Sequence, residues 1–215
     1  MPSEITVAPT LSPEDARRIE ALRARDEAAF AALVAEYGPA MLRVARQLVR
    51  DRAVAEEVVQ EAWLRVLRGI ASFEGRSSLK TWVFTILTNA AKTLAEREGR
   101  TVPLSAVSDD AAVDPERFLH EGRWAGYWAA PPSPWSLPEG RLLAAEARAV
   151  IERALADLPT AQATVLTMRD LVGFDADEVC NVLEISESNQ RVLLHRARAK
   201  VRQALQDYVA DETDT

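Results

Sequence analysis

The sequence holds very little of the chemistry that metal centres, disulfides and most hydrolytic active sites require. Its 215 residues include one cysteine, Cys180, and two histidines, His120 and His195. A single cysteine excludes an intramolecular disulfide and a cysteine-cluster metal site. No glycine-rich phosphate loop, nucleophile elbow or histidine–glutamate metal spacing occurs either. We therefore expect no catalytic residue, no cofactor and no metal ion, and we do not expect an enzyme.

Long apolar runs and an excess of basic residues are also missing. No charged-then-apolar leader opens the chain, and no stretch of about 18 apolar residues occurs, so we expect a soluble, cytoplasmic protein without membrane insertion. The formal net charge is −7, whereas a protein that simply coats nucleic acid is basic overall. Any binding of nucleic acid must therefore be local or must depend on a partner.

What the first hundred residues do contain is apolar side chains at helical spacing. Residues 12–14, Ser-Pro-Glu, predict a helix start with a capping hydroxyl, a first-turn proline and an acid near the positive end of the helix dipole. Gly-Pro at residues 38–39 predicts a break between two helices. Further helices are predicted over residues 53–68 and 79–94, joined by a turn over residues 73–78. No segment alternates with period two, so the predicted fold class is all-α.

The second half divides into a segment without periodicity and a helical segment. Residues 99–140 hold six prolines, an acidic cluster and three tryptophans, Trp124, Trp128 and Trp135, and predict a long flexible linker. The helical pattern resumes at Arg141. The predicted organisation is two small helical domains joined by this linker: an N-terminal extension with a short helix (1–25), a helical bundle (26–98), the linker (99–140), a helix-turn-helix domain (141–209) and a tail (210–215).

Residues 174–202 predict a helix, a tight turn at residues 184–185 and a second helix rich in arginine. Asp175 can cap the first helix and Ser186 the second, because a side-chain oxygen accepts from an orphan amide of the first turn. A helix-turn-helix sets the N-terminal residues of its second helix at base edges in the major groove. Residues 191–206 contain no acid, which favours an anionic ligand such as DNA over a salt-bridged, solvated surface.

Two further segments suit binding. The turn and helix start over residues 73–82 place aromatic and hydroxyl side chains beside basic ones, as single-stranded DNA requires for stacking and for phosphate contacts. Trp82 fits the apolar stripe and is expected in the core, so residues 74–78 are the better candidate. The helix over residues 53–68 carries acidic side chains beside its apolar stripe, which suits docking against a basic helical partner.

Together these segments resemble the sigma-70 family, and in particular its minimal members, the extracytoplasmic-function (ECF) sigma factors. Residues 29–97 resemble region 2 of the family, and residues 155–205 resemble region 4. The resemblance depends on VVQEAWLRV, FEGRSSLKTW and LHRAR occurring in this order. It implies a factor that directs core RNA polymerase to specific promoters and assists promoter opening.

The resemblance also implies partners and residue roles. The partners are bacterial core RNA polymerase (the clamp helices of the beta-prime subunit and the flap of the beta subunit), promoter DNA and an anti-sigma factor. Residues implied at the clamp helices are Glu56, Glu57, Val59, Gln60 and Trp63. Residues implied at the minus-ten element are Phe73, Arg76, Ser77, Ser78, Lys80, Thr81, Trp82 and Asn89. Residues implied at the minus-thirty-five element are Ser188, Asn189, Arg191, His195 and Arg196.

The chain departs from the usual pattern of the family in the helix-turn-helix and the linker. Glu184 stands where the family often has glycine, which costs about 1 kcal/mol if φ is positive there. Residues 188–190, Ser-Asn-Gln, replace a common Gly-Thr-Val, and Leu193 replaces a common basic residue. The longer linker indicates that its tryptophans dock on polymerase, on an anti-sigma factor or on the protein itself, or that it is a plain tether. Two alternative functions stay open: a dimeric stand-alone helix-turn-helix regulator and a helical adaptor without a DNA role.

Overall fold

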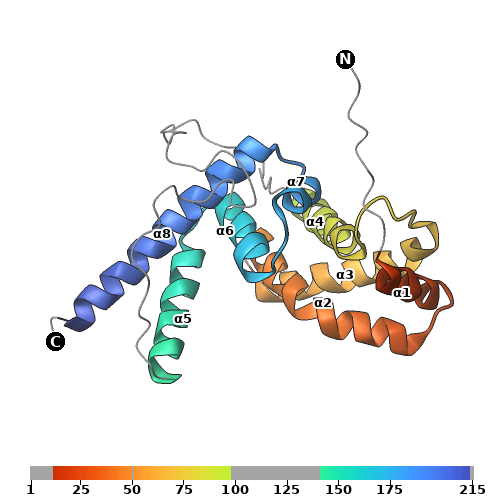
Figure 1. Cartoon of the computed structure of the whole chain (residues 1–215), viewed down its shortest axis with the longest axis horizontal. Coiled ribbons are helices and arrows are strands. Elements are labelled where there is room, and N and C mark those ends of the chain that lie inside the picture. The colour runs from red at the N-terminus through yellow and green to blue at the C-terminus, as the bar shows by residue number, and fades with distance from the viewer. Residues whose placement is uncertain (1–11, 50, 98–140, 214–215) are drawn as a thin grey trace, which may run out of the picture. The chain divides into compact units, whose positions relative to one another are not determined.

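The computed structural model describes residues 12–49, 51–97 and 141–213, with side chains from 146 to 210 in the last range. Every regular element in these ranges is a helix, which confirms the predicted all-α class (Figure 1). The predicted linker, with His120, Trp124, Trp128 and Trp135, lies outside the described residues. The chain forms two compact units, Met1–Leu104 with Thr167–Ile185 and Ser105–Leu166 with Ser186–Thr215.

The division differs from the predicted domain boundaries, because the segment Thr167–Ile185 belongs to the same unit as the N-terminal helices. The first unit contains α1 (Pro13–Arg23), α2 (Glu27–Leu48), α3 (Arg52–Gly69), the 3₁₀ turn η1 (Ile70–Ser72), α4 (Leu79–Arg97), the π-helical turn η3 (Thr167–Leu171) and α7 (Ala176–Leu183). The second unit contains α5 (Arg141–Ala156), α6 (Thr160–Leu166) and α8 (Glu187–Thr213).

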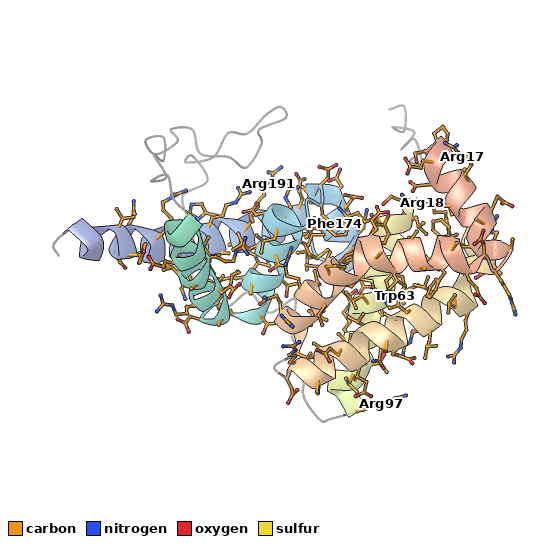
Figure 2. All side chains as sticks on the ribbon, turned by 90° about the horizontal axis from the view of Figure 1, so that it is seen from below. Arg17, Arg18, Trp63, Arg97, Phe174 and Arg191 are labelled. Carbon is orange, nitrogen blue, oxygen red and sulfur yellow. The ribbon has the colours of Figure 1, made fainter. Side chains whose placement is uncertain are left out.

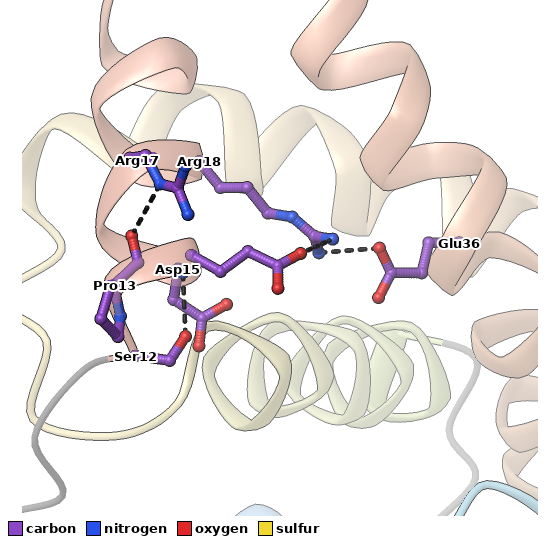
Figure 3. Close-up of polar contacts among 7 residues, drawn as sticks. Ser12, Pro13, Asp15, Arg17, Arg18 and Glu36 are labelled. Atoms are coloured by element: carbon purple, nitrogen blue, oxygen red, sulfur yellow. Dashed lines mark hydrogen bonds and ion pairs between the residues drawn. The ribbon is translucent and has the colours of Figure 1, made fainter.

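The start of α1 confirms the cap predicted from residues 12–14. Ser12 Oγ accepts a hydrogen bond from the amide of Asp15 at 3.0 Å (Figure 3). Four residues into the helix, Arg18 bridges Glu14 at 2.9 Å and Glu36 of α2 at 2.7 Å. Ion pairs as exposed as these contribute about 0–1 kcal/mol each, so they orient α1 on α2 more than they stabilise it.

α2 runs unbroken with Pro39 inside it, so the predicted break at residues 38–39 is wrong. An interior proline cannot donate to the carbonyl four residues earlier and costs about 3 kcal/mol. One buried stripe nevertheless continues across it: Leu33, Tyr37, Met41, Val44, Ala45 and Leu48. Full burial of each large apolar side chain contributes roughly 1.5–3 kcal/mol, so the stripe outweighs the proline. By length and mean hydropathy (1.2), α2 alone among the described helices is apolar enough to cross a membrane, yet this stripe packs against α3 and α4.

Aromatic rings at the centre of the first unit explain why Thr167–Ile185 belongs to it. Phe84 of α4 is fully buried and meets Tyr37 of α2 edge-on, with ring centroids 6.4 Å apart. Its other neighbour is Phe174, which follows η3 and is 1% exposed; the two centroids lie 4.9 Å apart. The Phe174 side chain thus anchors the segment before α7 in the core formed by α2 and α4.

In the second unit, α8 packs against α5 and α6. The hydroxyl of Tyr208 near the end of α8 donates to Glu146 Oε2 of α5 at 2.7 Å. This contact lies two helical turns beyond Val201, and α8 continues as helix to Thr213. The predicted tail over residues 210–215 therefore begins inside α8.

Candidate polymerase and nucleic-acid interfaces

The outer surface of α3 displays most of the residues implied at the polymerase. Asp51 Oδ1 caps the helix by accepting from the amide of Ala53 at 2.7 Å. Three of the implied residues are exposed: Glu56, Glu57 and Gln60. Val59 is half-buried. Trp63 is 9% exposed, lies between α2 and α3 in Figure 2, and meets the ring of Phe30 edge-on at 5.6 Å. Its ring therefore belongs to the core and does not reach the surface.

The same surface includes two leucines that the sequence did not indicate. Leu64 is 47% and Leu67 is 48% exposed. With Gln60 they stand at positions i, i+4 and i+7, so they form one stripe along the helix. That spacing is the signal that could have found them. We call Glu56, Glu57, Gln60, Leu64 and Leu67 the α3 surface.

A groove of about 300 Å³ separates this surface from α4. Glu57, Gln60 and Glu61 line it from α3, and Arg97 at the end of α4 lines it from the other side. Arg65 holds the Glu61 carboxylate at 2.8 Å, and this hydrogen bond lowers the pKa of Glu61. The groove thus combines two carboxylates, Glu57 and Glu61, with two guanidinium groups, Arg65 and Arg97, and with apolar side chains.

Arg23 of α1 holds the loop that follows η1. Arg23 Nη2 donates to the carbonyl of Phe73 at 2.7 Å, and its Nε donates to the carbonyl of Ile70 at 3.5 Å. Phe73 is 6% exposed and its ring lies 4.8 Å from that of the half-buried Trp82. Both aromatic residues implied at the minus-ten element are thus packed on each other and support the loop. The expectation that Trp82 belongs to the apolar stripe agrees with this packing.

Beyond these rings the loop is open to solvent. Gly75 has φ 72°, a left-handed conformation that favours glycine and turns the chain at this point. The side chain of Arg76 is 86% exposed and pairs with Glu74 at 3.1 Å. Ser77 is half-buried and Asn89, further along α4, is exposed. Arg76, Ser77 and Asn89 are the residues of the implied minus-ten set that α4 and its loop present outward.

The other three residues of that set contact the segment that carries α7. Ser78 Oγ and Thr81 Oγ1 both donate to Glu178 Oε1, at 3.1 Å and 2.8 Å. Lys80 Nζ donates to the carbonyl of Val172 at 3.2 Å. Burial acts to raise the pKa of Glu178, but the hydrogen bonds from the Asp175 amide, Thr81 and Ser78 outweigh it and lower that pKa. The Glu178 carboxylate is therefore held ionised against the start of α4.

The predicted turn and cap are both present. Glu184 ends α7 with φ 57° and ψ 42°. This left-handed conformation is strained for a residue with a side chain, as expected at a position where glycine is common. Ser186 Oγ accepts from the amide of Asn189 at 3.2 Å and caps α8. At its start, α7 has a capping box between Asp175 and Glu178.

The first turns of α8 separate outward residues from core residues. Ser188 is exposed, while Asn189, Arg191, His195 and Arg196 are half-buried. Gln190 is 2% and Leu193 is 3% exposed, so these two departures from the usual family pattern are changes in packing. Arg191 forms an ion pair with Glu187, just before the acid-free segment, and Arg196, Arg198 and Arg202 also have interaction partners. The argument from unpaired charge is therefore wrong, although the surface is still rich in arginine.

Comparison with known proteins decides the family. Residues 33–101 match the family described as sigma-70 region 2, and residues 148–201 match sigma-70, region 4. The chain belongs to the sigma-70 family. It is 30% identical over 193 residues to the RNA polymerase sigma-H factor of Pseudomonas aeruginosa, covering 90% of this chain and 94% of that one. It is 28% identical to the ECF RNA polymerase sigma-E factor of Escherichia coli, covering 89% of this chain and 94% of that one.

The fold of this sigma factor also matches solved structures. It superposes on the sigma factor RpoE of Bartonella quintana, solved in complex with the anti-sigma factor NepR, with a TM-score of 0.54. The match has 21% identity and covers 82% of this chain and 96% of that chain. The chain is thus an ECF-type sigma factor, a member of a family of transcription initiation factors rather than catalysts.

Proposed function

We propose that this sigma factor binds core RNA polymerase through the α3 surface, and that this contact precedes its contacts with DNA. The observation that carries the proposal is the exposed stripe of Gln60, Leu64 and Leu67 beside the groove between α3 and α4. Exposed leucines within a polar rim are typical of a protein interface. The clamp helices of the beta-prime subunit are the partner for this surface.

For DNA, the proposal divides the promoter between two surfaces. The exposed Arg76 and Asn89, with the half-buried Ser77, contact single-stranded DNA at the minus-ten element, where bases can flip out and phosphates need cations. Ser188, Asn189 and Arg191, with His195 and Arg196, contact the minus-thirty-five duplex from the start of α8, next to the flap of the beta subunit. Trp63 and Phe73 support these surfaces from within.

Regulation and location complete the proposal. The Bartonella quintana relative was solved with an anti-sigma factor, and an anti-sigma factor that covers these same surfaces is the expected regulator. The protein would act in the cytoplasm, where polymerase and promoter DNA meet.

Run-off transcription tests the proposal. Purified core polymerase, with and without the protein, is given fragments of the source genome, and the transcript ends are mapped. We expect new start sites that depend on the protein. Leu64→Ser should reduce their yield, whereas Leu171→Ser, which changes a leucine that is 44% exposed on η3, should not. A protein that binds isolated duplex as a dimer and starts no transcript would instead be a stand-alone regulator.

A further inference from the structure

The last turn of α1 carries an arginine that reaches the loop proposed to contact the minus-ten element. Two nitrogens of the Arg23 guanidinium donate to backbone carbonyls, Nη2 to Phe73 at 2.7 Å and Nε to Ile70 at 3.5 Å. The third, Nη1, lies 2.9 Å from Glu20 Oε1, one turn earlier in α1. The carboxylate therefore orients the planar guanidinium, and the guanidinium joins the end of η1 to α1.

Packing and a tight turn fix the position of this guanidinium. Ile19 and Leu22 are 3% and 5% exposed, and α1 packs against α2 and η1. The helix ends directly after Arg23, because Arg25 adopts a left-handed conformation with φ 59°. α1 is therefore a packed support from which the Arg23 side chain extends to the loop.

The loop over residues 74–78 is anchored at both ends. At its far end Leu79 is 0% exposed, and Ser78 Oγ accepts from an amide in the first turn of α4 at 3.0 Å. At its near end the Phe73 ring packs on Trp82. A Cβ atom at residue 69 would lie 3.2 Å from Trp82 Cζ2, so the glycine there leaves room for the indole ring. The guanidinium of α1 adds a backbone anchor to this near end.

We propose that Arg23 is a positioning residue for recognition of the minus-ten element. It holds the loop in the conformation in which Arg76 and Ser77 meet the single-stranded bases. The inference rests on the proposed function, because it assumes that this loop contacts the minus-ten strand. It extends that function to α1, which lies before residues 33–101, the segment that matches sigma-70 region 2.

A loop that is held in place should discriminate between bases better than a loop that can move. A site rejects a wrong base because polar groups stay unpaired, and this penalty falls when the loop can adjust to that base. Holding the loop in its bound conformation also strengthens binding of the right base, because less ordering remains to be done. Loss of the Arg23 hydrogen bonds should therefore weaken binding of the right base about fivefold and change binding of a wrong base little.

The test compares three substitutions in the full chain, each bound to core polymerase. Arg23→Ala removes the guanidinium. Arg23→Lys keeps a cation at the end of α1, where the helix dipole favours it, but a single ammonium group cannot reproduce the planar arrangement of donors. The control is Arg18→Ala, because Arg18 bridges Glu14 and Glu36 (Figure 3) and its loss loosens the contact of α1 with α2 instead of the loop.

The readout is a ratio of two affinities. Fluorescence anisotropy measures binding of the single-stranded minus-ten oligonucleotide from a start site mapped by run-off transcription, and of the same oligonucleotide with each base replaced in turn. We expect the ratio of right-base to wrong-base affinity to fall about fivefold in Arg23→Ala and about twofold in Arg23→Lys, and to stay unchanged in Arg18→Ala. Partial unfolding lowers both affinities equally, so a merely structural role would leave the ratio unchanged.

The outcomes separate this inference from the proposed function. An unchanged ratio in Arg23→Ala, an equal change in Arg18→Ala, or full recovery in Arg23→Lys overturns the positioning role while run-off transcription still stands. If Arg23→Ala does not fold, the ratio in Arg23→Lys decides, and an unchanged ratio there overturns the inference. Failure of the parent chain to start transcripts overturns the proposed function and the inference with it.

Discussion

The α3 surface and the side of α4 that carries Thr81 and Thr88 belong to adjacent helices of one bundle but differ in exposure. On α3, Gln60, Leu64 and Leu67 are exposed. On α4, Thr81 and Thr88 are almost fully buried under the segment that carries α7. The difference shows which side chains a partner can reach in this fold: those on the outer side of α3 are accessible, whereas Thr81 and Thr88 are not.

Removal of the buried Phe174 ring should have the largest effect, a loss in the free energy of unfolding. Phe174→Ala removes a side chain that is 1% exposed and packs on Phe84, and such changes cost about 3–5 kcal/mol. Urea unfolding measures the loss. Leu171→Ala, three residues earlier and 44% exposed, should stay within about 0.5 kcal/mol. Equal losses for the two variants would show that Phe174 does not anchor this segment.

The open surface should give the next largest effect. Leu64→Ser removes apolar area that core polymerase would bury, and the loss of about 1.4 kcal/mol weakens binding about tenfold. Titration of labelled core polymerase measures it. The free energy of unfolding should change little, because Leu64 is 47% exposed in the free protein. Unchanged polymerase affinity would show that the α3 surface does not bind core polymerase.

Arg23 holds the loop between α3 and α4, and loss of the Arg23 side chain should have a smaller effect. Arg23→Ala removes the hydrogen bonds to the carbonyls of Phe73 and Ile70, worth about 1 kcal/mol. Promoter opening, followed with a fluorescent base at the minus-ten element, should slow roughly fivefold, while polymerase binding is kept. The matched control is Arg17→Ala, since Arg17 Nε donates to Pro13 O within its own helix (Figure 3). Equal slowing by both variants would contradict a specific role for Arg23.

The smallest effect on stability is expected at the turn after α7. Glu184→Gly relieves left-handed strain of about 1 kcal/mol and removes an exposed ion pair worth about 0–1 kcal/mol. The free energy of unfolding should therefore change by less than about 1 kcal/mol. Urea titration checks this value. A loss above about 2 kcal/mol would mean that the ion pair between Lys92 and Glu184 holds the fold.

Local chemistry explains what the sequence could predict. The cap at Ser12, the cap at Ser186 and the strained turn at Glu184 each depend on a few neighbouring residues, and all three are present. The break at Pro39 was wrong because burial of a continuous stripe outweighs the cost of one proline. Local signals therefore give helix ends more securely than helix breaks.

The candidate surfaces were harder to predict because they depend on which side of a helix is covered. Trp63 and Leu67 share an apolar stripe, yet Trp63 packs on Phe30 and Leu67 is exposed. A stripe wider than one contact face leaves this choice to the tertiary packing. The pairing of Glu178 with Thr81 joins residues 97 apart in sequence, and no local pattern specifies it.

The most direct test of the account compares two leucine variants. The Leu64→Ser and Leu171→Ser chains are each titrated with labelled core polymerase. The account predicts about tenfold weaker binding for Leu64→Ser and no change for Leu171→Ser, because only Leu64 lies in the α3 surface. Equal affinities of the two variants would contradict it.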